Sequence, residues 1–179
     1  MFPPGYSRYA LLQRIAGEKP SPKVARFAAR YKFAGQLDSI SILGASEANA
    51  RAYLLAMRLG LAYSALESLE AIVGKKQIAL KDERLAAVAK SERLAKLRYF
   101  LSEGSDSKLR NRLELFQTSS SSDLRPVVEA LRHTMFHGQF NPSVTGLSSK
   151  SSLAFLDSLG MLVFKVIDQE AAKLFADPL

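Results

Sequence analysis

The stretch from Ser46 to Gly74, SEANARAYLLAMRLGLAYSALESLEAIVG, decides the fold of this chain. Its apolar residues recur at spacings of three and four, which is the pattern of the buried face of an α-helix. Ser46 suits the N-cap of such a helix, and Gly74 suits the position that ends it. We therefore expect a long central helix, whose buried residues are Leu55, Leu59, Ala62, Leu66, Leu69 and Val73, widened by Leu54, Leu61, Ala65 and Ile72.

Helical patterns continue on both sides of this stretch. We expect helices over about 23–36, 82–90, 91–103, 105–116 and 150–175, and a polar loop over 118–122. A further helix begins near Leu124, tolerates Pro126 in its first turn and ends at Gly138. A loop over 139–149 joins it to the last helix, which places six residues on one face: Leu156, Gly160, Val163, Ile167, Ala171 and Leu174.

No segment alternates apolar and polar residues as a half-buried strand does, and no internal repeat is present. The sequence therefore predicts an all-α helical bundle with a long central helix and a long C-terminal helix. Residues 23–179 are expected to form a single domain. Residues 1–22 contain four prolines and two glycines, which indicates an irregular basic N-terminal arm.

The composition excludes several classes of protein. The chain has 179 residues, of which 47% are hydrophobic and 23% charged, as in an ordinary soluble globular protein. It has no cysteine, which excludes a disulfide scaffold and a thiolate metal site. The N-terminus lacks a signal-peptide pattern, and Arg58 and Lys165 interrupt the two most apolar stretches, so we expect a cytoplasmic protein without a membrane span.

The net charge of +8 is unevenly distributed along the chain. Residues 1–35 carry seven Lys and Arg against one acid, and residues 75–112 carry eleven against five, so each block contributes +6. Residues 36–74 and 113–179 each contribute −2. This distribution suits a polyanionic partner such as RNA, or else the basic side chains only solvate helix surfaces.

Both histidines lie in the segment 131–138, LRHTMFHG. On a helical wheel Arg132, His133 and His137 fall outside the apolar face that is expected to be buried. Arg132 and His137 diverge by about 140° on a straight helix, so their cooperation requires the chain to unwind at Gly138. A fixed positive charge beside a titratable base is sufficient to cleave a phosphodiester without a metal. A solvent-exposed pair, or a patch that faces a second subunit, would give the same pattern.

His133 and His137 also have the i, i+4 spacing by which a helix can present two imidazoles to one metal ion. The chain offers no third histidine and no cysteine, and no glutamate lies between the pair. We therefore expect neither a metal site nor another cofactor.

The pattern Arg132-x-x-x-x-His137, with polar His133 after the arginine and Gly138 after the second histidine, resembles the signature motif of the HEPN superfamily. In many members the motif lies, as here, on the helix before the final one. Residues 63–74 are similar to the long first core helix of the Apea-like branch of that family. The resemblance covers about 46–175 and leaves the N-terminal residues unexplained.

This resemblance implies a helical bundle that commonly forms a homodimer and joins two motifs across the interface. It also implies metal-independent cleavage of RNA in active members. His137 would act as general base on a ribose 2′-OH or as acid toward the leaving 5′-oxygen. Arg132 would hold the phosphate and stabilise the developing charge, and His133 would orient the arginine or contact the phosphate. A toxin or defence role is expected, with any antitoxin a separate protein.

Two further groups are expected to support this site. Glu67 on the central helix would steer the motif, as an acidic residue of this helix does in some family members. The alternative is that Glu67 is exposed on the helix rim or paired with Arg58 or Lys75. The basic residues of the other group would bind RNA backbone, unless they form only a solvated face: Lys108, Arg110 and Arg112.

Two other functions remain open beside the ribonuclease. One is a catalytically silent HEPN domain that binds RNA or a nucleotide. The other is a helical protein-interaction module in which the motif only builds a dimer contact.

Overall fold

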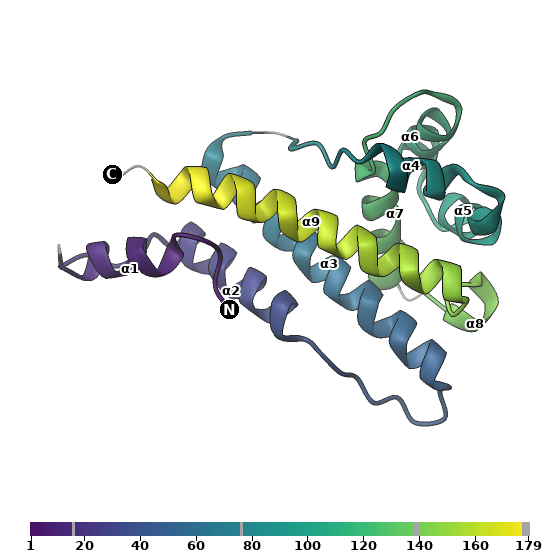
Figure 1. Cartoon of the computed structure of the whole chain (residues 1–179), viewed down its shortest axis with the longest axis horizontal. Helices are drawn as coiled ribbons and strands as arrows, with labels where there is room; N and C mark the ends of the chain where they lie inside the picture. The colour runs from purple at the N-terminus through teal and green to yellow at the C-terminus, as the bar shows by residue number, and fades with distance from the viewer. Residues whose placement is uncertain (16, 76, 138–139, 177–179) are drawn as a thin grey trace.

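The computed structural model describes residues 1–15, 17–75, 77–137 and 140–176. These residues form α-helices joined by short connections, and one isolated antiparallel bridge pairs Lys81 with Asp123. The two longest helices, α3 (Glu47–Val73) and α9 (Lys150–Ala176), lie side by side along the molecule (Figure 1). The predicted all-α class and the two long helices are confirmed.

Helix α3 is the centre of the bundle because it packs against α2 (Pro22–Gln36), α7 (Arg125–Phe136) and α9. The Ser46 hydroxyl accepts a hydrogen bond from the Asn49 N–H at 3.3 Å, and Gly74 ends the helix with a left-handed φ of 69°. The predicted stripe is buried or partly buried throughout its length. The contact of α3 with three neighbours explains why most of its circumference is apolar.

Two of these neighbours have a defined direction relative to α3. Helix α9 runs parallel to it (Figure 1), and Lys75 Nζ lies 2.5 Å from Glu170 Oε2, which joins the C-terminal ends of the two helices. Helix α2 runs antiparallel to α3 (Figure 1). Its Tyr31 hydroxyl donates a hydrogen bond of 2.6 Å to Asp168 Oδ1 of α9, so α2 is fixed to both long helices.

Shorter helices cover the other end of the bundle (Figure 1): α4 (Glu83–Lys90), a 3-10 turn (Glu92–Leu94), α5 (Ala95–Glu103), α6 (Ser107–Thr118) and α8 (Pro142–Thr145). The expected helices over 82–90, 91–103 and 105–116 are confirmed within two residues, apart from the turn that opens the second. Helix α8 lies in the segment 139–149 that was expected to be a loop. Helix α7 contacts α3, α5 and α6.

The expectation of an irregular arm over 1–22 is wrong for Tyr6–Ile15, which form helix α1. The prolines and glycines of this segment lie before Tyr6 and after Ile15, so none of them interrupts the helix. Aromatic side chains attach α1 to α9, since the rings of Tyr6 and Tyr9 lie 6.0 and 5.2 Å from the ring of Phe175. The arm is therefore part of the bundle.

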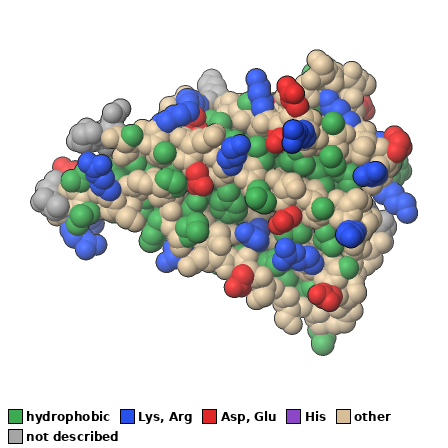
Figure 2. Space-filling view, viewed as in Figure 1, with side chains coloured by type: hydrophobic (Ala, Val, Ile, Leu, Met, Phe, Trp, Pro, Cys, Tyr) green, Lys and Arg blue, Asp and Glu red, His purple; other side chains and the backbone are tan. Residues whose placement is uncertain are grey.

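Charged side chains of both signs are interspersed with hydrophobic ones on the face drawn in Figure 2. This arrangement is typical of solvated helix surfaces, so the basic residues visible there need no polyanionic partner. Within the described part of the chain, no helix combines the length and the apolar character needed to cross a bilayer.

Candidate functional site

Helix α7 buries one face in the core and carries the histidine motif on another face. Val128, Leu131 and Thr134 face the interior and are buried, whereas Arg132 and His133 are only partly buried and lie on the other side of the helix. The helix ends at Phe136, and the N–H of the next residue, His137, donates to the His133 carbonyl at 3.0 Å. Gly138, which was expected to end the helix and redirect His137, lies outside the described residues.

A surface pocket of about 390 Å³ brings the motif together with residues of α3 and α6. Arg132, His133 and His137 all line it, although Arg132 and His137 would diverge by about 140° on a straight helix. The remaining lining residues are Glu67, Asp106, Lys108, Leu109, Arg112, Glu129 and Phe136. The motif, the expected steering residue and two of the three expected RNA-binding residues therefore share one cavity.

Arg110, the third residue expected to bind RNA, does not line this pocket. Its Nε donates to the Ser102 carbonyl at 3.0 Å, and its Nη2 donates to the Ser105 carbonyl at 3.4 Å. These hydrogen bonds satisfy backbone carbonyls at the end of α5 and in the turn that follows, so Arg110 stabilises the connection between α5 and α6.

The two histidines lie against each other. Their ring centroids are 4.2 Å apart, with 41° between the ring planes, as expected for neighbours one helical turn apart. Among the described residues, no group of three or more potential ligands is arranged to hold a metal ion. An imidazole ring can exchange a proton or form a hydrogen bond to an anion.

Arg132 is held across the pocket by α3. Its Nη1 lies 3.4 Å from Glu67 Oε1, and its guanidinium carbon lies 6.0 Å from the centre of the Tyr63 ring. Its side chain is still 40% exposed. Its Nε is buried and has no hydrogen-bond partner among the described residues. The protein therefore orients this guanidinium without saturating its donors.

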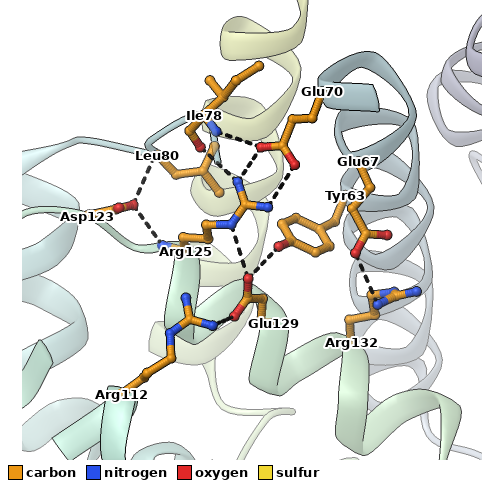
Figure 3. A network of polar contacts seen from close by, with 10 residues as sticks. All are labelled: Tyr63, Glu67, Glu70, Ile78, Leu80, Arg112, Asp123, Arg125, Glu129 and Arg132. Atoms are coloured by element: carbon orange, nitrogen blue, oxygen red, sulfur yellow. Dashed lines mark hydrogen bonds and ion pairs between the residues drawn. The ribbon is translucent and has the colours of Figure 1, made fainter. Parts of the chain in front are cut away.

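A buried ionic network lies behind the pocket (Figure 3). Arg125 pairs with both carboxylate oxygens of Glu70, with a distance of 2.9 Å from Nη2 to Oε2, and the two side chains are only 5% and 8% exposed. The same guanidinium donates through Nε to Glu129 Oε1 at 3.0 Å, and Glu129 also accepts from Arg112. The Tyr63 hydroxyl donates to the same Glu129 oxygen at 2.7 Å. This network fixes α7 against α3 and α6, and two of its members, Arg112 and Glu129, line the pocket.

Burial and charge act on the titratable groups of this region. Burial raises the pKa of Glu67, whereas the positive charges of Arg132 and Arg125 lower it in part. Burial also raises the pKa of Tyr63, and its hydrogen bond to Glu129 adds to that effect. Glu67 is therefore a weaker acid than an exposed glutamate, and Tyr63 remains a neutral hydrogen-bond donor.

The buried network was not predicted from the sequence. Arg125 and Glu129 have the i, i+4 spacing of a helical ion pair, and this spacing was the one local signal of the network. Glu70 and Arg125 are 55 residues apart, so their pairing has no local signal. Arg58 and Lys75 were the alternative partners expected for Glu67. The salt bridge of Glu67 is with Arg132, and Lys75 pairs with Glu170.

Comparison of the chain with protein-family models, with curated proteins and with solved structures gave no match.

Proposed function

We propose that this protein is a HEPN-type, metal-independent endoribonuclease that acts in the cytoplasm. The observation that supports the proposal most strongly is the shared pocket of Arg132, His133 and His137. In this pocket His137 exchanges the proton of a ribose 2′-OH or of the leaving 5′-oxygen. Arg132, oriented by Glu67, binds the phosphate and stabilises the charge that develops on it in the transition state.

The three carboxylates of the pocket already have partners, and the first of them, Glu67, pairs with Arg132. Asp106 caps α6 by accepting from the Leu109 N–H at 2.8 Å. Glu129 accepts hydrogen bonds from Tyr63, Arg112 and Arg125. Lys108, which forms no salt bridge among the described residues, and the partly exposed guanidinium of Arg132 are therefore the groups that we expect to meet a phosphate first.

The site is completed by a second copy of the chain in this proposal. Phe136 lines the pocket beside the motif, and 61% of its surface is exposed. An aromatic side chain exposed at this position supports a contact with another protein surface, and a two-fold axis there would join two motifs. A toxin or defence nuclease, restrained by a separate antitoxin protein, is the cellular role that we propose.

Incubation of the purified protein with mixed RNA in EDTA tests the proposal. The wild type is expected to cleave, and Arg132→Ala and His137→Ala are each expected to slow cleavage by about 10²–10⁴-fold, as loss of an acid–base or charge-stabilising group does. Lys165→Ala, an exposed change on α9 outside the pocket, is the matched control and should cleave normally.

Cleavage that survives in both pocket variants overturns the proposal. RNA binding without cleavage, lost when Lys108 and Arg112 are reversed in charge, would instead assign a catalytically silent RNA-binding domain. If neither cleavage nor binding occurs and Arg132→Ala dissociates a dimer, the protein is a helical interaction module.

A further inference from the structure

Helix α2 carries a basic face that the proposed catalytic site does not use. Lys23, Arg26 and Arg30 follow one another at spacings of three and four residues, so they share one side of the helix, and all three are exposed. They line a second pocket of about 240 Å³, together with Glu67, Ser68 and Ala71 of α3. This face lies outside the segment 46–175 that carries the family resemblance.

The protein positions Arg30 of this face without neutralising it. Arg30 Nη1 donates to Ser68 Oγ at 2.6 Å and to the Ser64 carbonyl at 3.3 Å, and both acceptors are uncharged. Among the described residues, no carboxylate forms a salt bridge with Lys23, Arg26 or Arg30. The pocket therefore has an uncompensated positive charge, which favours an anionic ligand.

The two pockets adjoin at Glu67. This residue lines both of them, and its carboxylate pairs with Arg132 on the side of the histidine motif. Basic side chains therefore extend from α2, past Glu67, to Arg132 on α7 and Lys108 on α6.

We propose that the Lys23–Arg26–Arg30 face of α2 binds the phosphate backbone of the same single RNA strand that enters the Arg132 pocket. This inference rests on the proposed function for the identity of the ligand. A single strand follows such a surface because backbone contacts do not depend on base sequence, and each contact adds to the affinity. The face would set the minimum length of RNA that binds well.

Fluorescence anisotropy with a labelled single-stranded RNA of about 12 nucleotides tests the inference. The double variant Lys23→Glu with Arg26→Glu is expected to raise the Kd by about tenfold or more, and the slope of log K against log salt should fall by about 0.7 for each lost contact. Lys23→Ala with Arg26→Ala should give a smaller effect in the same direction. Lys165→Glu is the matched charge reversal and should bind as the wild type does, and circular dichroism checks that all variants fold.

The outcomes separate this inference from the nuclease proposal. A wild-type Kd and salt slope in both α2 variants overturns the inference, whether or not the protein cleaves RNA. An equal loss of binding in Lys165→Glu also overturns it, because the effect would then be one of net charge. Weakened binding in the α2 variants of a protein that never cleaves RNA supports the inference and overturns the nuclease.

Discussion

Glu67 Oε1 on α3 lies 3.4 Å from Arg132 Nη1 on α7, and the two side chains line the same pocket. Both are more than one-third exposed, so their attraction contributes little to stability. The ion pair instead positions the Arg132 guanidinium, which lies over the Tyr63 ring and lines the same pocket as the two imidazoles.

Replacement Glu67→Gln should impair catalysis more than folding. The amide keeps the shape of the side chain but loses the charge that orients Arg132, so we expect kcat for RNA cleavage to fall by about tenfold. The free energy of unfolding should change by less than about 1 kcal/mol, because the ion pair is solvent-accessible. Kinetics and urea unfolding measure the two effects, with Glu103→Gln, an exposed change outside the pocket, as control. A wild-type kcat in Glu67→Gln would exclude the positioning role.

The raised pKa of Glu67 gives a pH dependence with a defined sign. Between the ordinary value of 4.5 and the higher value in the folded state, the folded protein binds more protons than the unfolded chain. The stabilisation from Glu67 is therefore fully present below pH 4.5 and decreases as the pH rises through that window. The stability of the wild type relative to Glu67→Gln should fall over this range in urea unfolding. A difference that stays constant or increases with pH would contradict the shift.

The Arg125–Glu70 pair should be essential for folding, because both side chains are almost completely buried. Arg125→Met leaves the Glu70 carboxylate without its partner, so we expect unfolding to become easier by about 3–5 kcal/mol. The double variant Arg125→Met with Glu70→Leu removes both charges and should recover most of this loss. Arg112→Met, at the more exposed end of the network, should cost about 0–1 kcal/mol. Equal losses in Arg112→Met and Arg125→Met would contradict the burial of this pair.

Gly5→Ala should detach α1 from the bundle. Gly5 has a φ of +79°, and an added Cβ would lie 2.7 Å from the Cβ of Phe175, which cannot move without its helix. We expect faster hydrogen exchange over residues 6–15, with the exchange of α3 unchanged. Gly44→Ala is the matched control, because Gly44 also has a positive φ but has no neighbour within 4 Å of an added Cβ. Similar exchange of α1 in the two variants would show that its docking does not depend on this close approach.

Local signals predicted most of the fold. The boundaries of α3 were predicted because Ser46 and Gly74 mark them directly, and α9 was predicted from a long apolar stripe. Helix α1 was missed because the density of proline and glycine was averaged over 22 residues, whereas these residues flank a helix that has none. Position along the chain, and not composition, decides whether such residues break a helix.

The candidate site was predicted in part. Arg132, His133 and His137 are close in sequence, so one helix determines their common location. From the sequence, Glu67 was a candidate to steer the motif, with an exposed acid or a pair with Arg58 or Lys75 as the alternative. Its contact with Arg132 joins residues 65 positions apart and depends on how α3 packs against α7. The burial of the Arg125–Glu70 pair also depends on tertiary packing, and so does the contact of Arg110 with Ser102. A single sequence does not reveal such contacts between distant residues.

The chemical ends of the RNA fragments made in EDTA test the central claim most directly. Proton exchange by His137 at a ribose 2′-OH, with Arg132 on the phosphate, leaves a 2′,3′-cyclic phosphate on one fragment and a 5′-hydroxyl on the other. Mass spectrometry of the products should find these ends with the wild type and with Lys165→Ala, and should not find them with His137→Ala. Fragments with 5′-phosphate ends, or the same cyclic phosphates from His137→Ala, would contradict the account.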